Sequence, residues 1–254
     1  MSGNRQLMPP LAERVRPASL QDFMGQEHLT GEGTLLQESI AAGNFFSCIL
    51  WGPPGTGKTT LAKILANSLE GDFFQMSAVS SGVKDLRKII ETAKTNLALK
   101  TVTLLFIDEI HRFNKAQQDA LLHAVEEGTL TLIGATTENP SFEVISPLLS
   151  RCRVLKLNSL AEDVLKSILL NAINSDVVLI KHNISFKDGT QEKLVLASGG
   201  DARKMLNTLE AAVTISGKDG KTVVVDKKLL SEALQSKSQI YDKAGDYHYD
   251  TISA

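Results

Sequence analysis

The sequence predicts an α/β fold, in which a parallel five-stranded sheet carries a phosphate-binding loop and a small all-helical domain follows. Three observations lead to this fold class. Short apolar runs of the kind found in strands alternate with helical patterns up to residue 157. A glycine-rich loop stands directly between the first of those runs and a helical pattern. Beyond residue 158 the helical patterns follow one another without strand runs between them.

Five runs are expected to form the strands of the sheet. Several are apolar throughout, which is typical of strands that are buried on both faces of a parallel sheet. The last run alternates instead, with Arg153 and Lys156 among its polar positions, as a half-buried strand does. In chain order the five runs are 47–51, 72–76, 101–108, 130–137 and 153–157.

Helical patterns fill the intervals between these strands. One begins at Thr59 and closes with Gly71, and another begins near Asn114 and closes with Gly128. Between them, apolar residues recur every three or four positions through 82–98. Because strands and helices alternate, we expect the strands to be parallel.

Pattern and composition divide the chain into segments. Two helices with apolar faces at 164–173 and 202–213 mark a small helical domain. The last residues hold all three tyrosines of the chain, and this abrupt change indicates the start of a further domain that is cut off. The predicted boundaries are 1–17 for an N-terminal segment, 18–157 for the α/β core, 158–238 for the helical lid domain and 239–254 for the final piece.

Composition is that of an ordinary globular protein, with 254 residues of which 43% are hydrophobic and 22% charged. The formal net charge is −2, so any contact with nucleic acid must be local. Two cysteines, Cys48 and Cys152, lack metal-ligand spacing and are expected to be small buried hydrophobes in a reducing compartment. The N-terminus lacks the apolar core of a signal peptide and no run is long enough to span a membrane, so we expect a cytoplasmic protein.

The stretch "GPPGTGKTT" matches the phosphate-binding pattern GxxxxGK[ST] between a strand and a helix. Glycines let backbone N–H groups approach phosphate oxygens, and the helix N-terminus adds donors and a positive dipole end. Lys58 is expected at the β- and γ-phosphates of ATP, and the Thr59 hydroxyl is expected to bind Mg²⁺. The predicted nucleotide-binding residues are Gly52, Pro53, Pro54, Gly55, Thr56, Gly57, Lys58, Thr59 and Thr60.

Two carboxylates end the run "TLLFIDE", at Asp108 and Glu109. Ligands of open α/β sheets bind at the carboxyl ends of the strands, so both carboxylates should face the same crevice as the glycine-rich loop. Asp108 suits the Mg²⁺ shell, together with Thr59, and Glu109 suits the activation of a water molecule.

Polar residues also follow the run 130–137, where Thr136, Thr137, Glu138 and Asn139 come in succession. One of them could hold the attacking water or contact the γ-phosphate. For Glu138 and Asn139, a capped turn before Pro140 is an equally good interpretation.

Five segments together resemble the AAA+ ATPases of the clamp-loader and branch-migration clade, and within that clade the members that act in replication-associated recombination. The resemblance extends from Pro10 through essentially the whole chain. It implies an AAA+ core with a helical lid, hydrolysis of ATP with Mg²⁺, and assembly as a homo-oligomer, a tetramer in the family, through a domain beyond residue 254. The segments are "GPPGTGKTT", "LLFIDEIHRFNKAQQDALL", "GATTENPSF", "LLSRCR" and "GDARKMLNTLE".

The resemblance also implies roles for single residues. The family's Ser-Arg-Cys motif supplies an arginine finger to ATP on the neighbouring subunit, and Arg151 is the arginine of that motif here. Thr137 matches sensor 1, with Asn139 as a rival, and Arg203 matches sensor 2. His111 is expected to hold the strand end rather than to perform catalysis. The segment that contacts adenine implies Arg16, Pro17, Met24 and Gln26 as further ligands.

The partners implied by the resemblance are single-stranded DNA or DNA ends and forks, and a single-strand-binding protein. Lys84, Arg87 and Lys115 match positions that track DNA phosphates in clamp loaders, although each could be an ordinary solvated charge. The function expected is a DNA-stimulated ATPase at stalled or broken replication forks, associated with the bacterial nucleoid. Two other functions stay open: a nucleotide-gated scaffold with little hydrolysis, and a small-molecule kinase.

Overall fold

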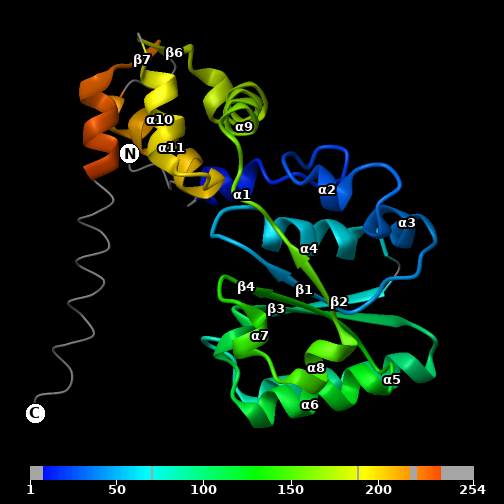
Figure 1. Ribbon diagram of the computed structural model, residues 1–254. Coiled ribbons are helices and arrows are strands. Elements are labelled where there is room, and N and C mark those ends of the chain that lie inside the picture. Colours follow the sequence, from blue (N-terminus) through cyan, green and yellow to red (C-terminus); the bar gives the residue numbers. More distant parts are fainter. Residues whose placement is uncertain (1–7, 70, 188, 218–221, 236–254) are drawn as a thin grey trace, which may run out of the picture. The chain divides into compact units, whose positions relative to one another are not determined.

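The computed structural model describes residues 8–69, 71–187, 189–217 and 222–235 (Figure 1). The chain divides into two compact units. The core unit contains Pro17–Ser159, and the helical unit contains the described residues before Pro17 together with those from Leu160 onward. The segment 239–254, predicted to begin a further domain, lies outside the described residues.

The core unit contains a parallel five-stranded sheet, as the sequence predicts. The strand order is β2-β3-β4-β1-β5, so the first strand of the chain lies inside the sheet, between β4 and β5. The strands are β1 (Cys48–Trp51), β2 (Gly71–Ser77), β3 (Val102–Asp108), β4 (Thr131–Thr136) and β5 (Arg153–Lys156).

Helices cover both faces of this sheet (Figure 1). The helix after the glycine-rich loop ends at Asn67, short of the predicted Gly71. Gly71 begins β2 instead, where a Cβ atom would lie 2.4 Å from the Val102 carbonyl oxygen. The helices are α2 (Glu27–Thr30), α3 (Leu35–Ala41), α4 (Lys58–Asn67), α5 (Val83–Ala98), η1 (Ile110–Arg112), α6 (Lys115–Glu126), α7 (Pro140–Glu143) and α8 (Ser146–Arg151).

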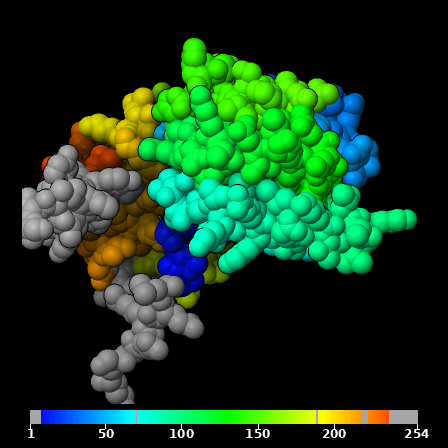
Figure 2. Space-filling view, turned by 90° about the horizontal axis from the view of Figure 1, so that it is seen from below, coloured from blue at the N-terminus to red at the C-terminus, as the bar shows by residue number. Residues whose placement is uncertain are grey.

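Strand β3 shows how one sheet supports two apolar layers. Leu105 and Ile107 point to the face covered by α5, α6 and α8, and Leu104 and Phe106 point to the face covered by α4. All four side chains are buried, and each contributes about 1.5 to 3 kcal/mol relative to exposure. Figure 2 shows the outer surface of the first layer, where α5 and α6 lie side by side. The purely apolar runs are therefore buried on both faces, as the sequence predicts.

The helical unit is largely helical but is not free of strands. Two strands of three residues each, β6 and β7, pair in parallel, which corrects the prediction of an all-helical domain. Runs this short do not show a strand period in the sequence, so they were missed. No helix among the described residues combines the length and apolar composition that a membrane span requires. The elements are α1 (Leu11–Arg14), α9 (Glu162–Ser175), η2 (Leu179–Lys181), β6 (Ile184–Phe186), α10 (Thr190–Ser198), α11 (Ala202–Ser216) and β7 (Val223–Val225).

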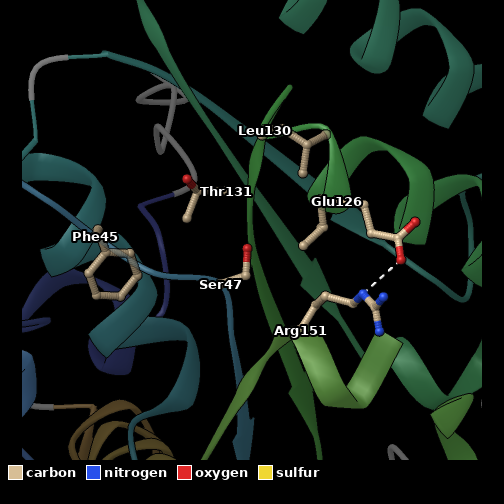
Figure 3. A pocket seen from close by; sticks show the side chains of 8 residues that line it. Phe45, Ser47, Glu126, Leu130, Thr131 and Arg151 are labelled. Carbon is tan, nitrogen blue, oxygen red and sulfur yellow. Dashed lines mark ion pairs between the residues drawn. The ribbon is translucent and has the colours of Figure 1, made fainter. Parts of the chain in front are cut away.

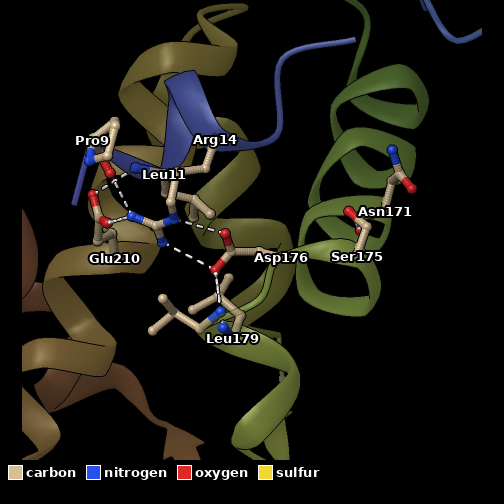
Figure 4. A network of polar contacts seen from close by, with 9 residues as sticks. Pro9, Leu11, Arg14, Asn171, Ser175, Asp176, Leu179 and Glu210 are labelled. Carbon is tan, nitrogen blue, oxygen red and sulfur yellow. Dashed lines mark hydrogen bonds and ion pairs between the residues drawn. The ribbon is translucent and has the colours of Figure 1, made fainter. Parts of the chain in front are cut away.

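Arg14 fastens the N-terminal segment to the helical unit (Figure 4). Its Nε and Nη2 atoms donate to the two carboxylate oxygens of Asp176 at 2.7 and 3.0 Å, and Nη1 donates to Glu210 at 2.6 Å and to the Pro9 carbonyl at 2.7 Å. The side chains of Arg14 and Asp176 are only 9% and 1% exposed. A bidentate pair with so little solvent is among the stronger ion pairs in proteins. It ties α1 to the residues that follow α9 and to α11.

The pKa of Asp176 reflects this arrangement. Burial alone would raise the pKa of the carboxyl group. The hydrogen bonds from Arg14 and from the backbone N–H of Leu179 outweigh burial and lower the pKa below its ordinary value. The folded state therefore favours the ionised carboxylate, and the stabilisation is present above the unfolded-state pKa and is lost as the pH falls through the folded-state pKa.

Both cysteines are free thiols, and burial raises the pKa of each. Cys48 is fully buried in β1, and the pKa of the half-buried Cys152 thiol is raised to about 12. Thiols with such pKa values are protonated at neutral pH and are weak nucleophiles. The cysteines thus behave as small apolar side chains, as expected.

We expect Arg14→Met to lower the free energy of unfolding by about 3 kcal/mol at pH 7, because the variant leaves a buried carboxylate without its partner. The loss should shrink as the pH falls toward the lowered pKa of Asp176, because the carboxylate that Arg14 stabilises is then protonated. Chemical denaturation of both chains at several pH values measures it. Lys94→Met, which breaks the exposed pair with Glu91, is the matched control and should change little. An equal loss at pH 7 and pH 3 would contradict this explanation.

Candidate active site

The carboxyl ends of three neighbouring strands form the edge at which the predicted site residues meet. Trp51, the last residue of β1, lies opposite Thr136, the last residue of β4. The backbone N–H of Gly52 donates to the Thr136 carbonyl at 3.2 Å, so the glycine-rich loop begins beside the end of β4. Asp108 ends β3 on the other side of β4. This is the edge where open α/β sheets bind ligands.

The loop has the conformation that a bound phosphate requires. Gly55 and Gly57 adopt positive φ angles of 68° and 105°, and α4 begins immediately afterwards at Lys58. The N-cap residue of α4 is Gly57, which makes no side-chain cap hydrogen bond. Backbone N–H groups and the helix dipole at a helix N-terminus favour a bound anion. The residues present fit the phosphates of a nucleotide.

Residues outside the loop pack closely against two of its glycines. A Cβ atom at Gly57 would lie 2.8 Å from the ring of Phe23, and a Cβ atom at Gly52 would lie 2.3 Å from the carbonyl oxygen of Leu157. Both positions therefore require glycine for close approach, and Gly57 also requires it for its positive φ angle. The loop is held between the segment around Phe23 and the end of β5.

Lys58 places its ammonium group inside the loop. The side chain is largely buried, with the residue 8% exposed, and Nζ donates to the carbonyl oxygens of Gly52 at 2.6 Å and Pro53 at 2.8 Å. Thr56 is also buried and donates to the Pro53 carbonyl at 2.8 Å, which closes the turn. A phosphate in the loop would therefore meet a fixed positive charge. Of the other loop residues, Pro54 is exposed, and Gly55, Thr59 and Thr60 are half-buried.

Gln26 has a bracing position that the sequence did not predict. Its side chain is fully buried, and its amide exchanges two hydrogen bonds with the backbone of Asn158, at 2.8 and 3.0 Å. The same Nε2 lies 3.4 Å from the carbonyl oxygen of Thr56. Gln26 thus joins the phosphate loop to the residue that follows Leu157.

Asp108 and Glu109 stand at the turn from β3 into η1. Both are half-buried, and the Asp108 carbonyl accepts from the Ala78 N–H at 2.9 Å. Glu109 adopts the left-handed conformation, with φ 56° and ψ 46°, which is uncommon for a residue with a Cβ atom and is found disproportionately at functional sites. The turn directs two successive carboxylates to the same edge as the loop.

The end of β4 distinguishes the two candidates for sensor 1. Asn139 caps α7, because its side-chain oxygen accepts from the Ser141 N–H at 3.0 Å. The capped turn left open for Asn139 is therefore present. Thr137 is half-buried, and its hydroxyl makes no hydrogen bond within the described residues. The geometry thus favours Thr137 over Asn139 for a contact with phosphate.

Arg151 lies near the amino ends of the strands, at the edge of the sheet opposite the one that carries the glycine-rich loop. It ends α8, and Arg153, two residues later, donates its N–H to the Ser47 carbonyl at the start of β1. The glycine-rich loop begins only after Trp51, roughly 13 Å farther along the strand direction. The guanidinium group therefore has no route to the phosphate loop of its own chain.

An ion pair and a hollow surround Arg151 (Figure 3). Its Nε atom lies 2.7 Å from a carboxylate oxygen of Glu126, the last residue of α6, and Nη1 donates to the Ser150 hydroxyl at 2.7 Å. The two paired side chains are 46% and 34% exposed, so the contact is in reach of solvent. The hollow measures about 540 Å³ and is lined by Phe45, Ser47, Val125, Glu126, Gly128, Leu130, Thr131 and Arg151.

The remaining candidates are spread over the two units, and their roles stay predictions. Arg16 belongs to the helical unit and forms an ion pair with Glu13. Arg203 is exposed in the first turn of α11 in the same unit. Pro17 and Met24 are half-buried in the core unit.

Sequence reasoning missed Phe23 and Glu126, and it predicted Gln26 as an adenine contact without its position beside the phosphate loop. Phe23 and Gln26 lie in a segment noted only for adenine contact, and no motif signals that they brace the phosphate loop. Glu126 has the ordinary appearance of a charge at the exposed end of a helix. Only the placement of α6 beside α8 identifies it as the partner of Arg151.

Comparison with known proteins agrees with this geometry. The family model for the ATPase family associated with various cellular activities (AAA) matches residues 48–159, and the model for the AAA C-terminal domain matches residues 180–254. The solved RuvB Holliday junction branch migration motor of Thermotoga maritima is similar in structure, with a TM-score of 0.69 and 28% identity over 87% of this chain and 72% of that chain.

Curated relatives are similar along nearly the whole chain. The chain is 45% identical over 246 residues to the replication-associated recombination protein A of Haemophilus influenzae, and 46% identical over 255 residues to that of Escherichia coli K12. Each match covers 96% of this chain and 55% of the relative, so the chain spans about half the length of the curated relatives it matches. The chain therefore contains an AAA domain, followed by an AAA C-terminal domain.

Proposed function

We propose that this chain is the ATP-hydrolysing part of an oligomeric factor that maintains DNA during replication and recombination, at stalled forks or DNA ends. The observation that supports hydrolysis most strongly is the shared strand edge, where the phosphate loop, Asp108 and Glu109 meet. The proposed process is supported by relatives named for replication-associated recombination and by the likeness to a branch migration motor. We further propose that such a factor is located with the nucleoid in the bacterial cytoplasm.

ATP would bind with its phosphates at the N-terminus of α4. Backbone N–H groups of the loop would contact the phosphate oxygens, and Lys58 would turn from the loop carbonyls toward the β- and γ-phosphates. Thr59 and Asp108 would hold Mg²⁺, whose charge would neutralise the phosphate oxygens during transfer. A Mg²⁺ ion bound by one carboxylate, one hydroxyl and phosphate is the usual arrangement at such sites.

Hydrolysis would use the half-buried carboxylate of Glu109 to accept a proton from the attacking water. Base catalysis of this kind contributes about 10² to 10⁴ in rate. Thr137 would contact the γ-phosphate from the end of β4. Arg203 would act from the helical unit as the second sensor, and Arg16, Pro17 and Met24 would contact adenine, as the family resemblance implies.

Arg151 would act on ATP bound to a neighbouring subunit, because it lies at the edge of the sheet opposite its own phosphate loop. An interface that joins one edge of a subunit to the opposite edge of the next is head-to-tail, and repetition of it can close a ring. The chain would therefore work as a homo-oligomer. Its site is complete only when a second copy supplies the guanidinium group.

The ion pair with Glu126 would be exchanged for phosphate in that assembly. Both side chains are partly exposed, and pairs of this kind contribute about 1 kcal/mol or less. An arginine finger accelerates phosphoryl transfer by about 10³ to 10⁵. The gain at the phosphate is much larger than the loss of the pair, so Glu126 would not prevent the exchange.

DNA would contact the same edge of the sheet that carries the loop. Lys84 and Arg87 lie in the first turns of α5, which follows β2, and Lys115 begins α6, which follows β3. All three side chains are exposed. The overall charge of −2 provides no long-range attraction, so these contacts would become effective when several subunits align them along one strand. A single-strand-binding protein is a further candidate partner.

We expect the ATPase rate per subunit to rise with protein concentration, because each site needs a neighbour. Arg151→Ala should reduce that rate by about 10³-fold or more at every concentration, because an arginine finger accelerates phosphoryl transfer by at least about that factor. ATP affinity should stay within a small factor, since Arg151 is remote from the loop of its own chain. Phosphate release at increasing protein concentration and titration with a fluorescent ATP analogue provide the two measurements.

Arg153→Ala is the matched control for this experiment, because it removes an exposed arginine two residues away that packs against Phe46. The control should keep the native rate. A rate that is independent of protein concentration, together with native activity of Arg151→Ala, would disprove the shared site. Transfer of the γ-phosphate to an acceptor other than water would disprove the ATPase function itself.

For DNA binding, we expect the combined change of Lys84, Arg87 and Lys115 to alanine to weaken binding of single-stranded oligonucleotides of any sequence. The slope of log affinity against log salt concentration should become shallower by about 0.7 for each lost phosphate contact. Fluorescence anisotropy at several salt concentrations measures it. Lys94→Ala, near the other end of α5, is the control. An unchanged slope would exclude these residues as the DNA contacts.

A further inference from the structure

We propose that His111 is a positioning residue that joins Glu109 to the end of β4 and thereby aims its carboxylate. The inference rests on the proposed ATPase function, in which Glu109 accepts a proton from water. The histidine lies two residues beyond Glu109, in η1, and its side chain is 9% exposed. His111 is as buried as a residue with a purely structural role, yet it contacts Glu109, the proposed base.

One nitrogen of His111 lies between two partners. Its Nδ1 atom is 2.9 Å from the Thr136 hydroxyl oxygen and 3.3 Å from a carboxylate oxygen of Glu109. Thr136 is the last residue of β4 and is fully buried. The imidazole ring thus connects the carboxylate at the end of β3 with a fixed point on the next strand.

The hydrogen bonds of Thr136 indicate which tautomer is present. Its hydroxyl donates to the Glu138 carbonyl at 3.2 Å and accepts from the Glu138 N–H at 3.0 Å. A hydroxyl has one donor and two acceptor positions, so the remaining position accepts from His111. A lone pair on Nδ1 would also face the Glu109 carboxylate unfavourably. Nδ1 therefore carries the proton and donates it to Thr136, and the positive end of this N–H group lies near the Glu109 carboxylate.

Thr136 is in turn tied to the phosphate loop. Its carbonyl accepts from the Gly52 N–H at 3.2 Å. Hydrogen bonds therefore connect the first residue of the loop with Thr136 and Thr136 with His111, and the 3.3 Å contact between His111 and Glu109 extends this path to the carboxylate. These contacts fix the position of the Glu109 carboxylate relative to the loop that would hold the phosphates.

The backbone of the same turn is fixed separately by Ile110. This side chain is fully buried against β4, where a Cβ atom at Gly134 would lie 2.9 Å from Ile110 Cδ1. Glu109 itself has a left-handed backbone and a long, one-third exposed side chain. Packing of Ile110 holds the main chain, but it leaves the carboxylate free to rotate. His111 provides the contact that restricts it.

The expected consequence is a loss of turnover without a loss of binding. His111 has Glu109 and Thr136 as partners, and no side chain of the loop among the described residues is one of them. A misplaced base loses part of a contribution of about 10² to 10⁴, so removal of His111 should lower kcat about 10- to 100-fold. KM and the affinity for an ATP analogue should change little.

Three substitutions at His111 test the inference in the oligomeric protein at saturating protein concentration. His111→Ala should show the loss of kcat. His111→Asn places an amide N–H near the position of Nδ1 and should recover most of the native kcat, whereas His111→Gln, whose amide reaches the position of Nε2, should not. His123→Ala, an exposed histidine on α6, is the control. Thermal unfolding establishes that each variant is folded.

Several outcomes would overturn the inference. Native kcat in His111→Ala would do so, as would a Gln variant that is as active as the Asn variant, and this comparison holds even if the Ala variant fails to fold. Glu109→Gln, assayed in parallel, separates the inference from the proposed function. Retained turnover in Glu109→Gln removes the proposed role of Glu109 as the base, whereas an absence of ATP hydrolysis by the native chain removes the proposed function itself. An inactive Glu109→Gln beside a fully active His111→Ala removes only the role of His111.

Discussion

The pairing of β1 between β4 and β5 is the constraint on which the rest of the site depends. Its register places Trp51 opposite Thr136, so the phosphate loop begins at the edge where β3 ends with Asp108 and is followed by Glu109. The same pairing with β5 places Arg151 beside the start of β1. One strand therefore separates the proposed nucleotide site from the proposed arginine finger. Within one chain, the proposed arginine finger therefore lies too far from the proposed nucleotide site to act on it.

This separation explains why the small contacts around each half matter. Gln26 and Phe23 hold the loop in a conformation that suits phosphate, and His111 is positioned to fix the carboxylate of Glu109. On the other edge, Arg151 forms a partly exposed pair with Glu126 and donates to the Ser150 hydroxyl. The loop is thus held by buried hydrogen bonds and the proposed base by its contact with the buried His111, whereas the arginine makes only partly exposed contacts. Rigid positioning of the base and mobility of the finger are the properties that a site shared between subunits requires.

Much of this architecture could be predicted from the sequence, because its signals are local. The apolar run before Asp108 and the glycines from Gly52 onward specify strands, a loop and their order. Contacts between distant segments left no such signal. Glu126 meets Arg151 only through helix packing, and β6 and β7 are too short to show a period. The adenine contact predicted for Gln26 stays a prediction, and no sequence signal indicates its hydrogen bonds with Asn158.

A mixing experiment tests the shared site most directly. Chains with Arg151→Ala lack the finger but keep Glu109, and chains with Glu109→Gln lack the base but keep Arg151. Each chain alone should be nearly inactive, and a mixture should hydrolyse ATP, because some interfaces then combine an intact base with an intact arginine from the neighbour. The account predicts this recovery, increasing with total protein concentration. A mixture that stays as inactive as its components, while the native chain is active under the same conditions, would contradict it.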